Sequence, residues 1–227
     1  KNIIKITTAA VVLLVGAVSC SKDSFDINKN PNQATDSTIV YNVILPAAEN
    51  NTARLVARNW GWLQNYLSYW ARSGTYAPNT NEETYELTTT FQAQIWSNAY
   101  DNLYDYEVMR ISAAKAGATM YEGIARIMKS HNYAMLVDIY NNVPYSQSLK
   151  GSANTTPAYD KGVDIYKDLL RQIDTGIALI KNADLSSSGN SDIETNDIML
   201  GGDQTRWIQF GNTLKLRILT KFMNGGV

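Results

Sequence analysis

The sequence predicts an all-α protein, and three observations lead to that prediction. Apolar residues recur every three or four positions in five long segments, no segment alternates polar and apolar residues as a half-buried strand does, and turn-forming residues separate the segments. Each apolar stripe is one-sided, so the helices must pack on one another. The predicted helices are 38–70, 91–116, 120–140, 159–180 and 203–222, with long loops at 141–158 and 182–202.

Several residues mark where these helices begin, bend or end. Pro46 is expected to break the first helix near its start, because proline has no amide hydrogen. Gly117 should end the second helix, Asp203 should cap the start of the last, and Gly225 should mark its end. Residues 83–90 could be extended. The helix pairs have the length of tetratricopeptide-like units, although no repeated motif of about 34 residues is present.

The first twenty residues have the layout of an export signal. A positive start is followed by a short apolar run and by small residues that lead to Cys20, the only cysteine of the chain. The run is shorter than the roughly 20 apolar residues that span a bilayer, and the order of the zones is that of a secretory signal. It resembles a bacterial lipobox. We therefore expect 1–19 to be a signal peptide, Cys20 to be lipidated (with palmitate among the acyl chains) and 20–36 to be a polar tether. The alternative is an ordinary cleaved signal with an incidental cysteine.

Composition excludes several classes of function. The net charge is −1, with 20 basic and 21 acidic residues and no basic block, so nucleic acid is not an expected partner. A single histidine and a single cysteine argue against a zinc site, and no cofactor is expected. His131 is expected to be half-buried and structural. The chain has 5 Trp and 14 Tyr but only 4 Phe. Because Trp and Tyr join an apolar face to a polar tip, this excess suits a binding surface.

The best candidate for a binding site is an aromatic stretch between the first two helices. Trp62, Tyr66, Tyr69 and Trp70 would share one helical face. Core packing between long helices is the simpler explanation for Trp62 and Tyr66. Beyond Trp70 the chain becomes polar, and flat rings beside amides and hydroxyls suit a sugar. The residues predicted to contact a glycan are Trp70, Arg72, Tyr76 and Asn79.

Three further segments carry a family resemblance. They are ARIMK (125–129) followed by VDIYNNVPYS (137–146), then PAYD (157–160) with IY (165–166), and finally Asp203 with WIQFGNTLKLR (207–217). Their order and spacing resemble the SusD/RagB-like family of outer-membrane lipoproteins of Bacteroidetes. Asn141-Asn142 departs from the Gly-Asp or Gly-Asn of the family, but asparagine tolerates left-handed backbone. These segments are expected to be scaffold, with Asn212 bonded to buried backbone.

The resemblance implies a SusD-like α-α superhelix in residues 37–227. Members of the family are usually much longer, so we expect this chain to be an N-terminal portion that lacks the C-terminal half. The implied function is non-catalytic: the protein would bind a nutrient oligosaccharide at the cell surface and deliver it to a TonB-dependent, SusC-like transporter, held to the outer membrane by a lipid anchor. Two alternatives remain open, a peptide-binding member of the same family and a tetratricopeptide-like adaptor for envelope assembly. An enzyme is not expected, because nothing fixes the two carboxylates that glycoside hydrolysis needs.

Overall fold

The computed structural model describes residues 40–58, 60–70, 73–74 and 84–223, apart from the side chains of Arg58 and Met223. The predictions for the signal peptide, Cys20, the tether and Gly225 therefore concern parts of the chain outside these ranges, and the domain boundaries stay predictions.

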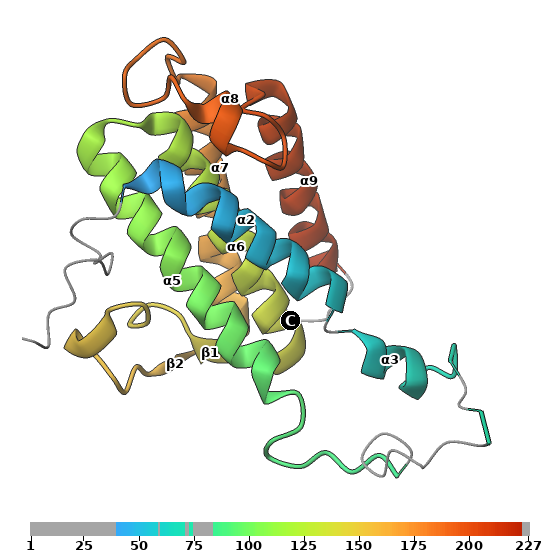
Figure 1. Ribbon diagram of the computed structural model, residues 1–227. Helices are drawn as coiled ribbons and strands as arrows, with labels where there is room; N and C mark the ends of the chain where they lie inside the picture. Colours follow the sequence, from blue (N-terminus) through green and yellow to red (C-terminus); the bar gives the residue numbers. More distant parts are fainter. Residues whose placement is uncertain (1–39, 59, 71–72, 75–83, 224–227) are drawn as a thin grey trace, which may run out of the picture. The chain divides into compact units, whose positions relative to one another are not determined.

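The all-α prediction is confirmed (Figure 1). Two strands of two residues each, β1 (Val143–Pro144) and β2 (Tyr159–Asp160), pair antiparallel with Val143 opposite Asp160. The five long helices are α2 (Tyr41–Arg58), α5 (Ala93–Ala116), α6 (Thr119–Tyr140), α7 (Gly162–Lys181) and α9 (Gln204–Met223). The short ones are α3 (Gly61–Tyr66), the 3₁₀ turn η2 (Gly151–Ala153) and α8 (Ile193–Asn196).

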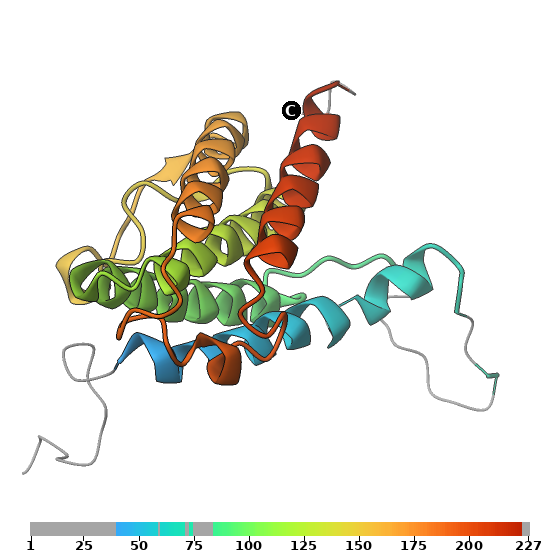
Figure 2. The ribbon, with the colours of Figure 1, turned by 90° about the horizontal axis from the view of Figure 1, so that it is seen from above.

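The helices pack in the order of the chain around α6. Helix α6 lies between α5 and α7, α2 packs on α5, and α9 packs on α7 (Figures 1 and 2). Both faces of α6 are therefore covered, and 14 of its 22 residues are buried. The flanking helices bury only one stripe each, as the sequence predicts for α7 with Ile165, Leu169, Ile173 and Ile180. This sequential layering of helix pairs is the superhelical arrangement that was expected.

Glycines let α6 and α7 approach closely at one point. A Cβ added to Gly123 would lie 2.7 Å from the carbonyl oxygen of Gly176, and one added to Gly176 would lie 2.8 Å from the carbonyl oxygen of Gly123. No side chain fits between two backbones at that separation, so the crossing requires glycine on both helices.

Most of the predicted helix ends are correct. Gly117 ends α5 with a φ of 69°, and Asp203 accepts a hydrogen bond from the amide of Arg206 in the first turn of α9, at 3.1 Å. The predicted break at Pro46 is wrong, since α2 continues through it. Proline at the sixth residue removes only the bond to the carbonyl of Asn42, and the apolar side chains around it keep the helix packed. The aromatic end of the first predicted helix is also wrong, because α2 stops at Arg58.

The segments 84–90 and 203–217 also correct the sequence analysis. Residues 84–90 form turns and irregular backbone, so the extended strand expected there is absent from the part that the structure describes. Asn212 is exposed on α9, so its predicted bond to buried backbone is wrong. Lys215 and Arg217 of the same helix form ion pairs with Asp174 and Asp138 respectively.

The three segments that carry the family resemblance hold one another in place. Asp138, from the end of α6, accepts hydrogen bonds from Tyr166 of α7 and from Lys221 of α9. Asp160 accepts from the amides of Tyr145 and Ser146, at 3.0 and 2.9 Å. The turn that follows α6 places Asn141 at a φ of 62°. The prediction that these segments are scaffold therefore agrees with their contacts.

A buried polar network joins α9 to α2. Trp207 is fully buried, and its indole donates a hydrogen bond of 2.6 Å to Asp197. The carboxylate of Asp197 also accepts from three backbone amides, those of Met199, Leu200 and Gly202. Glu49 of α2 accepts from the amides of Ile198 and Met199, so the loop before α9 is bound from both sides.

Candidate functional site

The structure describes one of the four predicted glycan-binding residues. Trp70 is 61% exposed, as a ring available to a ligand must be. Arg72, Tyr76 and Asn79 lie outside the described residues, so their roles stay predictions. Helix α3 ends at Tyr66, so Tyr69 and Trp70 do not continue its face as predicted. They follow it in a turn, where Tyr69 is 74% exposed.

Aromatic rings from both sides of residues 75–83 come together around α3. Tyr66 stacks on Tyr85, with ring centroids 5.0 Å apart and an angle of 14° between the planes. Trp62 makes edge contacts with Tyr66 and with Phe91. Trp62 and Tyr66 are half-buried in this local cluster, rather than packed between long helices as the simpler explanation required. The cluster leaves Tyr85 largely exposed, although its ring stacks on Tyr66.

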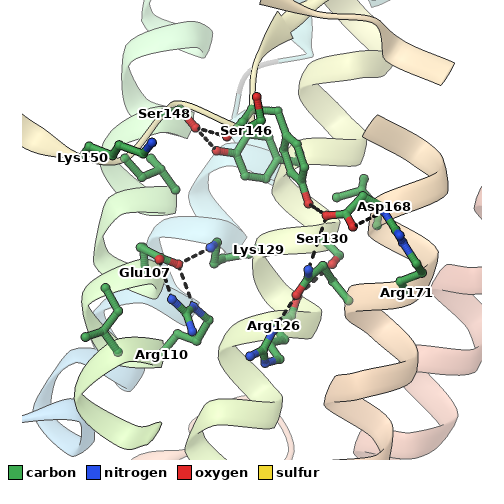
Figure 3. A pocket seen from close by; sticks show the side chains of 16 residues that line it. Glu107, Arg110, Arg126, Lys129, Ser130, Ser146, Ser148, Lys150, Asp168 and Arg171 are labelled. Carbon is green, nitrogen blue, oxygen red and sulfur yellow. Dashed lines mark hydrogen bonds and ion pairs between the residues drawn. The ribbon is translucent and has the colours of Figure 1, made fainter. Parts of the chain in front are cut away.

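A second candidate site, which the sequence analysis did not single out, is a pocket of about 710 Å³ between α5, α6, α7 and the loop after β1 (Figure 3). This volume falls in the usual range of small-molecule sites. Five basic side chains line it against two acidic ones. The polar lining consists of Glu107, Arg110, Arg126, Lys129, Ser130, Tyr133, Tyr145, Ser146, Ser148, Lys150, Asp168, Arg171 and Gln172.

One carboxylate forms ion pairs with two cations on the α5 side of the pocket. Glu107 accepts two hydrogen bonds from Arg110, at 2.7 and 2.9 Å, and one from Lys129, as Figure 3 shows. Burial alone would raise the pKa of Glu107, but the hydrogen bond from Arg110 and the charge of Lys129 hold it below its ordinary value. Burial lowers the pKa of Lys129, and Glu107 partly offsets that. The group of three keeps one surplus positive charge.

The opposite side of the pocket comes from α7. Asp168 accepts hydrogen bonds from Tyr145 and from Arg171. Figure 3 shows Asp168 and Arg171 next to each other on α7. Burial and the bond to Asp168 raise the pKa of the Tyr145 phenol, so it stays a neutral donor. Arg126 is held by Glu122 and by Gln172, at 2.8 and 2.6 Å. Even when Glu122 is counted, five basic groups face three acidic ones.

The sequence carried only a weak signal for this pocket. Most of its charged residues form ion pairs with a partner three or four positions away on the same helix, such as Glu107 with Arg110 and Asp168 with Arg171. Such pairs normally lie on solvated faces. Only the packing of α5 and α7 against α6 brings them to one cavity.

Comparison with known proteins settles the family. The sequence model of a SusD-like family, described as starch-binding and associating with the outer membrane, matches residues 28–224. The chain belongs to this SusD-like family. Curated proteins include no match to it.

Solved SusD-like structures share the fold of this chain at low sequence identity. A SusD/RagB family protein from Bacteroides thetaiotaomicron superposes with a TM-score of 0.69 and 21% identity, over 82% of this chain and 39% of that one. A second SusD-like protein from that organism gives 0.61 and 19%, over 80% and 38%. A chitin-binding SusD homolog from Flavobacterium johnsoniae gives 0.57 and 20%, over 77% and 38%. This SusD-like chain thus spans less than two fifths of the length of these relatives.

Two further findings concern the described part of this SusD-like chain. None of its helices is both long and apolar enough to cross a membrane. No three histidine, cysteine, aspartate or glutamate side chains within that part gather as metal ligands would. His131 is half-buried and hydrogen-bonded to the neighbouring Asn132, and burial lowers its pKa. Its half-burial agrees with the sequence analysis, and its structural role stays a prediction.

Proposed function

We propose that this SusD-like protein binds a nutrient glycan outside the cell and passes it to a TonB-dependent, SusC-like transporter in the outer membrane. The exposed aromatic surface around α3 carries the proposal. Tyr69, Trp70 and Tyr85 are 74%, 61% and 67% exposed, so each presents ring surface that a ligand can reach. Flat rings stack on the C–H faces of sugars, and the family is described as starch-binding.

The proposal includes binding without catalysis. The two carboxylates of the pocket are both committed to cations or hydroxyl donors. A glycosidase acid needs a raised pKa so that it keeps its proton near neutral pH. The pKa of Glu107 is instead lowered, so this carboxylate is a poor proton donor.

In this proposal a lipid on Cys20 holds the protein at the outer face of the outer membrane, with residues 20–36 as a tether. Holding the protein beside its transporter raises the effective concentration of captured glycan there, which compensates for modest affinity. Labelling of cells with radioactive palmitate should mark the protein, and a Cys20→Ala variant should remain unlabelled. An unlabelled wild-type protein would remove the anchor from the proposal.

The binding step is tested by calorimetry on the full chain in mild detergent, with starch and chitin oligosaccharides and with peptides of similar size. Trp70→Ala should weaken glycan binding about tenfold or more, because exposed aromatic anchors are worth about 2 kcal/mol at binding surfaces. Tyr159→Ala removes a similarly exposed ring from β2 and serves as the control. Equal affinity of the Trp70→Ala and wild-type proteins would place the site elsewhere, and binding of peptides alone would replace the glycan with a peptide ligand.

A further inference from the structure

The pocket between α5, α6 and α7 has a charge imbalance that the fold does not need. Arg110, Arg126 and Arg171 each have a carboxylate partner, while Lys129 shares Glu107 with Arg110. No carboxylate in the described part of the chain pairs with Lys150, at the end of the loop that follows β1. A purely structural ion-pair network would balance its charges, because each unpaired cation near others adds repulsion.

Hydrogen-bond donors are left over in the same place. The ammonium of Lys129 has three N–H donors and gives one bond, to Glu107, while its side chain is only 19% exposed. The Nε and one terminal nitrogen of Arg110 donate hydrogen bonds to Glu107, so its other terminal nitrogen remains available as a donor. Lys150 lines the same pocket and adds further donors to it. Such a set of cationic donors suits an acceptor-rich, negatively charged group. Partly buried cations are screened less by salt than surface ones, so such a group would be held firmly.

The remaining wall of the pocket fits a sugar ring rather than a bare ion. Tyr133 and Tyr145 lie on it in edge-to-face contact, with ring centroids 4.7 Å apart, and Leu149 and Leu169 add apolar surface. Ser146 and Ser148 also line it, with their hydroxyls donating to Asp160 and to the carbonyl of Tyr145. A volume of about 710 Å³ is far larger than an inorganic anion needs and suits a short oligosaccharide.

We propose that this pocket binds the anionic substituent of an acidic saccharide, a uronate carboxylate or a sulfate ester, with Lys129, Arg110 and Lys150 as its donors. The inference rests on the proposed function, since it takes the ligand to be a glycan. It adds that the glycan carries negative charge and that a site built on the helical scaffold, apart from the aromatic stretch, selects for it.

The test compares matched ligands and matched variants. Calorimetry on the full chain uses a galacturonate oligosaccharide, the same oligosaccharide with its carboxylates methyl-esterified, and a sulfated galactose oligosaccharide. The first variant, Lys150→Gln, changes an exposed residue, so its fold should match the wild type by circular dichroism and melting temperature. The control, Lys167→Gln, removes the same charge from an exposed position on α7 that does not line the pocket.

We expect the free acid to bind at least tenfold more tightly than its ester, and Lys150→Gln to weaken acid binding about fivefold to tenfold without changing ester binding. Lys167→Gln should leave both unchanged. A preference for the galacturonate over the sulfated sugar identifies the carboxylate as the group bound, and the reverse preference identifies the sulfate ester. Affinity for the acid should fall as salt rises from 50 to 300 mM, because added salt shortens the Debye length and screens the attraction between the ligand's negative charge and the basic side chains.

Other outcomes overturn the inference. Equal affinities for acid and ester, or equal losses of affinity in Lys150→Gln and Lys167→Gln, would show that the pocket does not discriminate between ligands by charge. Tighter binding of an acidic peptide than of any acidic saccharide would assign the pocket to a protein ligand instead. Neutral oligosaccharides that bind in a Trp70-dependent way, with no preference for acid, would leave the proposed function intact and refute only this inference. A chain that binds no saccharide of either kind would refute both.

Discussion

Glu49 should make the stability of this protein fall as pH rises. Its side chain is buried on α2, with one oxygen accepting from the amides of Ile198 and Met199 and the other without a hydrogen-bond partner in the described part of the chain. Burial and then the charge of the neighbouring Asp197 raise the pKa of Glu49 from 4.5 to about 9. The folded protein therefore carries this carboxyl protonated at neutral pH.

The sign and size of the effect follow from linkage. Because the folded pKa lies above the unfolded one, the group favours the folded state fully below pH 4.5, and this contribution is lost as pH rises toward 9. Each pH unit within that window costs about 1.4 kcal/mol. Between pH 5 and pH 8 the loss is therefore about 4 kcal/mol, a large share of the 5 to 15 kcal/mol that keeps a typical domain folded.

Glu49→Gln tests this reasoning. The amide keeps an oxygen for Ile198 and Met199, offers N–H donors to Asp197 and has no proton to lose. Urea unfolding followed by circular dichroism should give nearly equal stabilities for variant and wild type at pH 5, and a variant more stable by about 4 kcal/mol at pH 8. His131 and Glu107 titrate in both proteins, so their contributions cancel in the difference.

Glu194→Gln, at an exposed position on α8, is the control and should show no pH-dependent difference. A Glu49→Gln protein that is less stable than wild type at pH 8, or a difference that does not change between pH 5 and pH 8, would refute a protonated Glu49. The carboxylate would then be stabilised in its charged form by the two backbone amides.

Three other substitutions test the packing and the pocket. Gly123→Ala should destabilise the fold by about 2 kcal/mol, because its Cβ would meet the backbone of α7. The control, Gly74→Ala, has open space around it and should change the stability little. Similar losses in both variants would disprove the close crossing. Trp207→Phe removes the indole donor to Asp197 and leaves a cavity, and urea unfolding should show a loss of about 3 kcal/mol; a loss below 1 would mean the bond is unimportant. Glu107→Gln should cost roughly 2 to 3 kcal/mol at pH 7 in low salt, and a neutral result would show that the two cations do not need their partner.

The regular parts of the fold could be predicted because local rules determine them. The stripe from Ile165 to Ile180 fixes α7. Gly117 ends α5 through its left-handed backbone, and the side chain of Asp203 caps α9 with one hydrogen bond. Pro46 shows the limit of such rules. The cost of one lost hydrogen bond predicts a break, but α2 buries apolar side chains on both sides of that point, Leu45 before it and Ala48 after it, and this packing outweighs the lost bond.

The candidate site was harder to predict, because it depends on which helix faces meet. Lys129 and Glu107 are 22 residues apart, and no periodicity relates them. Each belongs to a helix whose polar side looks solvated when read alone. The aromatic stretch was recognisable because its rings are close together in the chain, yet the end of α3 at Tyr66 changes how Tyr69 and Trp70 are presented.

The side chains that join the family segments to one another differ from the donors proposed for the pocket, although one of those donors, Lys129, lies in a family segment. The segments that identify the family make contacts with one another: Asp138 with Tyr166, and Asp160 with the backbone of Tyr145. Asp138, Tyr166 and Asp160 do not line the pocket, so these contacts say little about what is bound. Lys150 makes no such contact, and its loss would leave the scaffold intact while changing the charge of the pocket. Selectivity among nutrients should therefore vary through loop residues of this kind, whereas substitutions at Asp138, Tyr166 or Asp160 should alter stability without altering which ligand is preferred.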